Sequence, residues 1–158
     1  MPFFPDTDEN AFYFSMFDEE QHWCRTTEKP FHLENIEWPS LEHYFQAMRF
    51  NDEEYRKSIA TTGTPEAIKK LKKGWLKAKR KDWKQIRTTV MTRGLYMQCQ
   101  IYPEMAQALL HTEDKRLVEN SLYDYFWGCG RDRRGENQYG KVLMNIRSKL
   151  RQDGQAKE

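Results

Sequence analysis

Apolar and polar residues follow two β-strand patterns along the first third of the chain. Residues 11–17 are mostly aromatic, and residues 31–38 alternate between apolar and polar side chains. We expect both segments to be strands of one small sheet. Pro39 favours an extended backbone before it, and the hydroxyl of Ser40 can cap a helix that begins near Leu41. The pattern therefore predicts that the second strand leads directly into a helix.

The helix that begins at Leu41 combines an apolar face with a polar stripe. Its apolar face consists of Leu41, Tyr44, Phe45 and Met48. At about 100° per residue, Glu42, Gln46 and Arg49 share a neighbouring arc of about 60°. Two interpretations of this stripe stay open. It is either a solvated face with a weak Glu/Arg contact, or the wall of a cleft in which Glu42, near the positive end of the helix dipole, faces a developing cation.

Helical periodicity accounts for most of the remaining chain. Further helices are expected from Asp52 to about Ile59, from Pro65 to about Lys73, from Asp82 to about Gln100, from Pro103 to Leu110 and from about Asn137 to Leu150. Aspartate and proline suit the start of a helix, because Asp caps free amides and Pro has no amide to leave unpaired. We expect a short strand over residues 116–119 and a frayed tail over residues 151–158. Without repeats or a long linker, the chain is expected to fold as one compact domain.

Composition argues against several classes of protein. With 158 residues and 38% hydrophobic side chains, the chain can build one core. No apolar run approaches the ~20 residues that span a bilayer, and the N-terminal sequence lacks the pattern of a signal peptide, so we expect a soluble, cytoplasmic protein. The three cysteines, Cys24, Cys99 and Cys129, and the scattered histidines lack metal-ligand spacing. We therefore expect reduced thiols, no metal and no cofactor.

The net charge of +2 is unevenly distributed along the chain. Residues 1–54 contain 13 acidic side chains and three basic ones, whereas residues 69–84 contain nine basic side chains and one acidic one. Trp75 and Trp83 lie within this basic segment, Lys69 to Lys84. The segment is either a solvated face or a site for phosphates or nucleic acid.

Residues 120–140 are the part of the chain least typical of a structural scaffold. They combine glycines and arginines with the aromatic side chains of Phe126 and Trp127: the glycines and arginines are Gly128, Gly130, Gly135, Gly140, Arg131, Arg133 and Arg134. Glycine allows backbone amides to approach a ligand closely, and functional groups are often carried by loops. The stretch is either a binding loop or an exposed turn with Trp127 in the core.

Three blocks of sequence resemble the NADAR superfamily, and within it the YbiA-like N-glycosidases. They are Phe14-Ser15, the segment Ser40-Leu41-Glu42-His43-Tyr44-Phe45-Gln46-Ala47-Met48-Arg49-Phe50, and a stretch that includes Asp124, Trp127-Gly128-Cys129-Gly130, Gly135-Glu136-Asn137-Gln138-Tyr139-Gly140 and Leu143-Met144. The resemblance covers about residues 11–150. It implies an α+β, mainly helical domain with a small β-sheet.

The resemblance also implies hydrolysis of an N-glycosidic bond between a ribose and a base. In YbiA-like members the substrates are ribosylaminopyrimidine 5′-phosphates, early intermediates of riboflavin biosynthesis, and their cleavage releases ribose 5-phosphate and limits metabolite damage. Other members cleave ADP-ribose from nucleobases, which is one alternative. Another is a non-catalytic nucleotide- or RNA-binding module. We expect a small-molecule substrate rather than nucleic acid or a membrane; the sequence gives no oligomeric state.

An N-glycosidase needs a carboxylate near the sugar carbon that becomes cationic and a route for protonating the departing base. The candidate catalytic residues are Glu42, favoured as the stabiliser of the cation, and Asp124, the second carboxylate, although these two roles can be exchanged. The candidate substrate-binding residues are Phe14, Ser15, Gln46, Arg49, Arg87, Trp127, Gly128 and Asn137. Among them, Trp127 and Phe14 suit a flat base, Asn137 suits a hydroxyl or phosphate, and the arginines, with one of Arg131, Arg133 and Arg134, suit the 5′-phosphate.

Position 49 departs from the family pattern that the resemblance implies. It is often a lysine, thought to form a Schiff base with the sugar in members that cleave ADP-ribose, but this chain has Arg49. A guanidinium stays protonated and cannot act as that nucleophile. Either water attacks the sugar directly, or Arg49 only anchors the substrate.

We also expect Glu42 and Trp127 to enclose one nucleotide-sized pocket.

Overall fold

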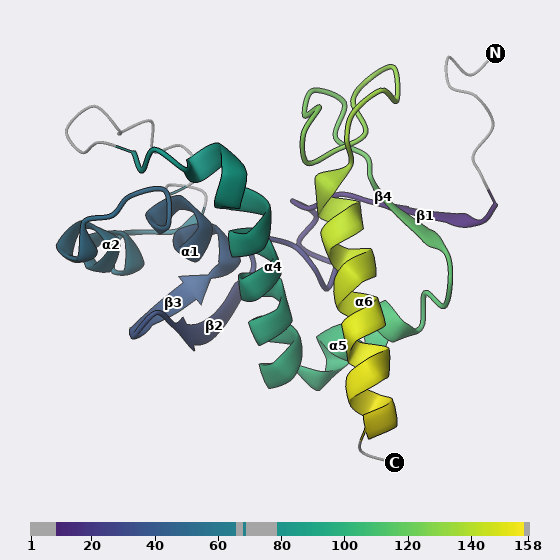
Figure 1. Ribbon diagram of the computed structural model, residues 1–158, viewed down its shortest axis with the longest axis horizontal. Helices are drawn as coiled ribbons and strands as arrows, with labels where there is room; N and C mark the ends of the chain where they lie inside the picture. The colour runs from purple at the N-terminus through teal and green to yellow at the C-terminus, as the bar shows by residue number, and fades with distance from the viewer. Residues whose placement is uncertain (1–8, 66–67, 69–78, 157–158) are drawn as a thin grey trace. The chain divides into compact units, whose positions relative to one another are not determined.

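The computed structural model describes residues 9–65, 68 and 79–156. The chain divides into two compact units, a terminal unit of Met1–Cys24 with Pro103–Glu158 and a central unit of Arg25–Tyr102. Five helices and four strands lie within the described residues (Figure 1). The helix expected over residues 65–73 and most of the basic segment Lys69 to Lys84 lie outside them. The prediction of a mainly helical α+β fold is confirmed.

The terminal unit contains a parallel pair of strands, β1 (Ala11–Phe14) and β4 (Arg116–Glu119), in which Phe14 faces Glu119. The helices α5 (Pro103–Leu110) and α6 (Gln138–Ala156) complete it, and α6 packs on both α5 and β4. The prediction that residues 11–17 and residues 31–38 belong to one small sheet is wrong. The first strand instead pairs with a strand about 105 residues later, which no local pattern could indicate.

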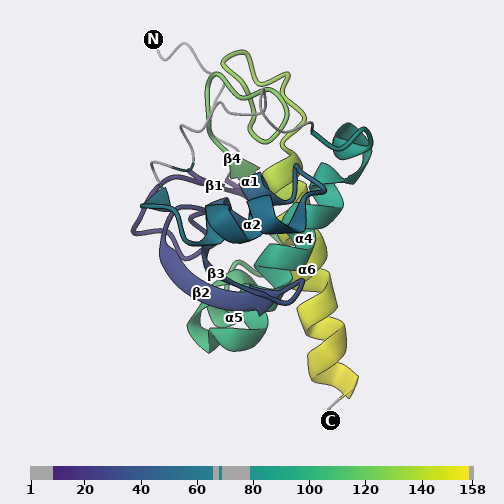
Figure 2. The same cartoon turned by 90° about the vertical axis from the view of Figure 1, so that its left-hand side faces the viewer.

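The central unit contains an antiparallel hairpin of β2 (Glu28–Leu33) and β3 (Ile36–Ser40), seen in both views (Figures 1 and 2). The single strand expected over residues 31–38 is therefore wrong, because the chain turns at Glu34 and Asn35. Both have positive φ, 56° and 61°, the backbone of a two-residue hairpin turn. Asn adopts this conformation readily but Glu does so rarely, so the turn had no clear sequence signal.

Three helices surround the hairpin in the central unit: α1 (Leu41–Ala47), α2 (Glu53–Ala60) and α4 (Trp83–Ile101). The predicted starts of all three helices are confirmed. Ser40 Oγ accepts the amide of His43 at the start of α1, and Asp52 Oδ1 accepts the amide of Tyr55 at the start of α2. Asp82 makes no such bond, because Arg80 engages its carboxylate.

The frayed tail expected from residue 151 is wrong, because α6 continues to Ala156. Three contacts stabilise this last part of the helix. Arg151 donates to Asp114 Oδ1 at 3.0 Å and to the carbonyl oxygen of Glu113, while Lys149 and Asp153 form an i,i+4 ion pair. None of the helices in the described part of the chain has the length and apolar character needed to cross a bilayer.

Candidate active site

The start of α1 holds Glu42 in a fixed position. Glu42 lies in the first turn, and its backbone amide donates to the carbonyl oxygen of Arg25 at 2.9 Å. Ser40 caps the next amide, so the first turn of α1 is fixed by two separate bonds. Glu42 is 1% exposed, which makes it a buried carboxyl group rather than part of a solvated face.

A chain of hydrogen bonds runs from Glu42 in both directions. Arg25 Nε donates to Glu42 Oε2 at 2.5 Å, and Gln46 Nε2 donates to Glu42 Oε1 at 2.8 Å. Arg49 Nη1 donates to Gln46 Oε1 at 2.7 Å. Because a guanidinium can only donate, Arg49 fixes the orientation of the Gln46 amide and turns its NH₂ group towards Glu42. The stripe predicted from helical spacing is a connected polar network.

Arg49 supplies the positive charge at the far end of this network. It is half-buried, and burial lowers the pKa of its guanidinium from the ordinary value, against the opposing effect of Glu42. Its Nε atom is buried and has no hydrogen-bond partner among the described residues. A buried donor of this kind can receive an anion, because an unpaired buried donor is unfavourable. Arg87, also half-buried, lies on α4 of the same unit.

Asp124 organises the loop of residues 120–137 in the terminal unit. Its Oδ1 atom accepts the amides of Phe126 at 3.0 Å and Trp127 at 2.7 Å, an Asx turn. These two donors orient the half-buried carboxylate. Asp124 therefore has a structural role in the loop, whatever its chemical role.

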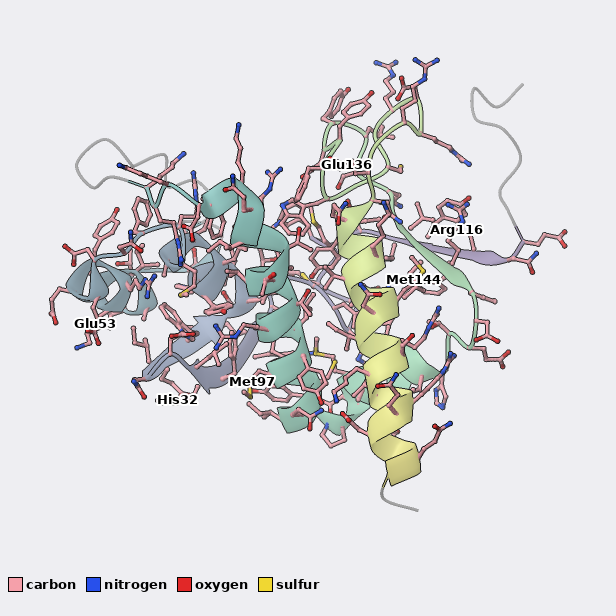
Figure 3. The ribbon with its side chains drawn as sticks, in the orientation of Figure 1. His32, Glu53, Met97, Arg116, Glu136 and Met144 are labelled. Carbon is pink, nitrogen blue, oxygen red and sulfur yellow. The ribbon has the colours of Figure 1, made fainter. Side chains whose placement is uncertain are left out.

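The loop covers the first turn of α6. The amides of Gln138 and Tyr139 donate to the carbonyl oxygens of Phe126 and Trp127 at 2.9 and 3.1 Å. Glu136, labelled in Figure 3, lies at the end of the loop beside this turn, and its amide donates to the carbonyl oxygen of Tyr125. The first two amides of α6, which a phosphate could otherwise use, therefore already have partners.

Asn137 joins the loop to β4. Its Oδ1 atom accepts the amide of Glu119 at 2.9 Å, and its Nδ2 atom donates to the carbonyl oxygen of Leu117 at 2.8 Å. Its φ of 51° is a left-handed conformation that Asn tolerates. These contacts identify Asn137 as a residue that positions the loop; its role in substrate binding stays a prediction.

The aromatic candidates of the terminal unit are packed against each other. Trp127 is 6% exposed, and its ring meets those of Phe126 and Tyr139 nearly at right angles, with centroids 4.7 and 6.3 Å apart. Phe14 meets the ring of Trp23 nearly at right angles and that of Tyr139 at a tilt of 48°, with centroids 5.5 and 6.0 Å apart. Stacking of either ring on a base stays a prediction.

The remaining candidates of this unit are placed by backbone contacts and surface pairs. Ser15 Oγ accepts the amide of Phe17. Gly128 is buried, and a side chain there would contact Glu119 Oε2 at 2.6 Å. Of the arginines, Arg133 lies over the ring of Tyr13 at 5.5 Å, and Arg134 pairs with Asp132.

Among the buried charged groups that sequence reasoning missed are Arg25 and Glu119. Glu119 accepts the amide of Met16 and both the amide and hydroxyl of Ser121. Burial raises the pKa of Glu119 above its ordinary value, against these hydrogen bonds. Glu119 was missed because it ends a short strand, where a buried acid gives no pattern. Arg25 was missed because it lies 17 residues before its partner.

The structure thus gathers Glu42, Gln46 and Arg49 in the central unit and Asp124, Trp127, Gly128 and Asn137 in the terminal unit. The expectation that Glu42 and Trp127 serve one pocket stays a prediction. Among the described residues, no group of three or more His, Cys, Asp or Glu side chains could hold a metal ion.

A model of the NADAR domain matches residues 2–151, a range that includes parts of both units. This chain belongs to the NADAR family. The NMR structure of the Escherichia coli protein YbiA superimposes with a TM-score of 0.81 at 29% identity, covering 94% of this chain and 89% of that one. The resemblance inferred from the three sequence blocks is therefore confirmed.

Curated relatives within the NADAR family carry functional names. The N-glycosidase YbiA of Escherichia coli is 31% identical over 138 residues, 87% of this chain and 86% of its own. The N-glycosidase Npun_R5314 of Nostoc punctiforme is 34% identical over 123 residues, 76% of this chain and 79% of its own. The riboflavin biosynthesis protein VVA0006 of Vibrio vulnificus is 35% identical over 118 residues, 73% of this chain but 31% of that longer protein.

Proposed function

We propose that this protein hydrolyses the N-glycosidic bond between ribose and base in ribosylaminopyrimidine 5′-phosphates and releases ribose 5-phosphate. An N-glycosidase activity is supported by membership of the NADAR family and by relatives that are named N-glycosidases over most of their length. A link to riboflavin biosynthesis is supported by the name of the Vibrio relative. The specific substrate, a ribosylaminopyrimidine 5′-phosphate, is proposed from the resemblance to the YbiA-like members of the family.

The observation that carries the proposed chemistry is the fixed, buried carboxyl group of Glu42. As the bond between the sugar carbon and the base nitrogen breaks, positive charge develops on the sugar ring. A negative group that is already oriented stabilises this charge without reorganising, and it acts most strongly where water is excluded. Glu42 meets both conditions, because two donors hold its oxygens and it is 1% exposed.

Water completes the reaction. Its oxygen bonds to the sugar carbon and keeps one proton in the new hydroxyl group, while the base nitrogen leaves with the bonding electrons. The other proton of water passes to a carboxylate, which returns to its charged form by giving that proton, through solvent, to the base nitrogen. We assign that proton transfer to Asp124. Arg49 anchors the 5′-phosphate through its buried Nε donor. Because its protonated guanidinium cannot form a Schiff base, water attacks the sugar directly.

A product assay tests the proposal. The protein is incubated with a panel of ribosylaminopyrimidine 5′-phosphates and ADP-ribosylated bases, and the products are identified by mass spectrometry. Ribose 5-phosphate is expected from the first group. Release of ADP-ribose alone would instead assign the protein to the ADP-ribosyl glycohydrolases.

Trapping tests the direct attack of water. Borohydride added during turnover reduces a Schiff base to a stable adduct, and none is expected here. An adduct on the protein that carries the mass of the sugar would disprove direct hydrolysis.

A further inference from the structure

We infer that Arg25 is a positioning residue for the reaction and acts by holding the carboxylate of Glu42. This inference rests on the proposed function and adds a residue outside the three sequence blocks. It comes from three contacts of Arg25 within the central unit, one made by its backbone carbonyl oxygen and two by its guanidinium group.

Arg25 holds Glu42 through both its backbone and its side chain. The carbonyl oxygen of Arg25 accepts the amide of Glu42 at 2.9 Å, which ties the first turn of α1 to the chain ahead of β2. The Nε atom of Arg25 donates to Glu42 Oε2 at 2.5 Å. Arg25 therefore holds both the backbone and the carboxylate of Glu42.

The ring of Phe45 holds the guanidinium from another side. The Cζ atom of Arg25 lies 4.9 Å from the centroid of this ring, a cation–π contact. Phe45 lies one helical turn after Glu42 on α1, so the clamp includes the helix that carries the carboxylate. The side chains of Arg25 and Glu42 are only 5% and 1% exposed, so water has little access to replace the contact between them.

The remaining contacts of the carboxylate explain why Arg25 matters for geometry. Gln46 engages Oε1, and Arg49 orients Gln46. Arg25 engages the other oxygen, Oε2. Without Arg25, Gln46 alone would set the direction of the carboxylate, which could then turn about its last side-chain bond. Displacement of a catalytic group by about 1 Å can lower the rate about 100-fold.

The contact pattern also predicts which kinetic constant changes. Arg25 contacts Glu42, and the charge of Glu42 acts when the sugar becomes cationic. An interaction made only in the transition state affects kcat rather than the binding of the substrate. A residue that only stabilises the fold would lower the amount of folded protein and leave kcat per folded molecule unchanged.

The test compares Arg25→Lys and Arg25→Met with Arg93→Lys and Arg93→Met. Arg93 pairs with Glu34 at 2.6 Å in the same unit but is 48% exposed, so it controls for the loss of an arginine ion pair. Lysine keeps the charge of Arg25 but lacks the planar Nε donor. Release of ribose 5-phosphate is measured per folded molecule, with the folded fraction determined by circular dichroism.

The expected result is a kcat lowered about 10- to 100-fold in both Arg25 variants, with KM changed less than about threefold and both Arg93 variants unchanged. If Arg25→Met fails to fold, Arg25→Lys decides. If the wild-type protein is active and Arg25→Lys has the same kcat, the positioning role of Arg25 is wrong, but the proposed function is not affected. A wild-type protein that releases no ribose 5-phosphate would overturn the proposed function, and this inference with it.

Discussion

Removing the charge of Glu42 should destabilise the protein strongly. The substitution Glu42→Gln keeps the size of the side chain, and sequence alone suggests that it leaves the fold intact. In the structure, however, it leaves the charge of Arg25 buried without its counter-ion, at a site where the side chains are only 5% and 1% exposed. Breaking a buried ion pair on one side costs about 3–5 kcal/mol of folding free energy.

Two comparisons in urea unfolding at neutral pH isolate the folding free energy that is lost when the Arg25–Glu42 pair is broken. The first is the double variant Arg25→Met/Glu42→Gln, which removes both charges and should recover most of the lost stability. The second is Glu34→Gln, which breaks the pair with Arg93, where the side chains are 48% and 33% exposed. That change should cost less than about 1 kcal/mol.

The reasoning would be refuted if Glu42→Gln lowered the free energy of unfolding no more than Glu34→Gln does, or if the double variant were less stable than Glu42→Gln. The result also affects enzymology. A loss of activity in Glu42→Gln alone combines unfolding with lost chemistry, so the double variant is the better probe of the carboxylate.

Three further predictions concern the terminal unit. Burial raises the pKa of Glu119 on folding, so between about pH 4.5 and 7 the native state binds more protons than the unfolded state, and the stability of the wild type should fall relative to that of Glu119→Gln as pH rises. If the free energy of unfolding in urea changed equally with pH in both proteins, this prediction would be wrong. Gly140→Ala should lower the free energy of unfolding by about 1–3 kcal/mol, since its methyl group would overlap the Leu117 carbonyl group. Gly154→Ala on the same helix should be neutral or raise it by up to about 1 kcal/mol, and equal melting temperatures of the two variants would contradict this. Trp127→Phe should raise KM about 5-fold or more if the ring stacks on the base, and an unchanged KM would exclude stacking.

Local interactions explain what the sequence could predict. The starts of α1 and α2 were predictable because a capping side chain contacts an amide only three residues away. The buried faces of α1 and α6 were predictable because helical periodicity follows from backbone geometry. The predicted apolar face of α1, which includes Tyr44, is buried as expected.

Non-local interactions explain what the sequence could not predict. The pairing of β1 with β4 joins residues more than 100 positions apart. The partner of Glu42 was hidden for the same reason, because an arginine 17 residues away outside any helix obeys no spacing rule. Helical spacing placed Glu42, Gln46 and Arg49 together, but only the structure distinguishes a buried network from a solvated stripe.

The contacts of the loop before α6 could not be predicted from composition. Its glycines and aromatic residues indicated close backbone approach, and the structure shows such approaches at Gly128, Gly135 and Gly140. The partners of these approaches are protein groups. Asn137, expected beside a ligand, binds the backbone of β4 through both atoms of its side-chain amide, and its role in substrate binding stays a prediction.

The most direct measurement is the rate of ribose 5-phosphate release by the wild-type protein and by the folded double variant Arg25→Met/Glu42→Gln, with a ribosylaminopyrimidine 5′-phosphate as substrate. Our account predicts that the wild type releases ribose 5-phosphate and free base in equal amounts. It also predicts that the double variant is slower by about 100-fold or more, since it has lost the charge that stabilises the sugar cation. Equal rates in the two folded proteins would contradict the account.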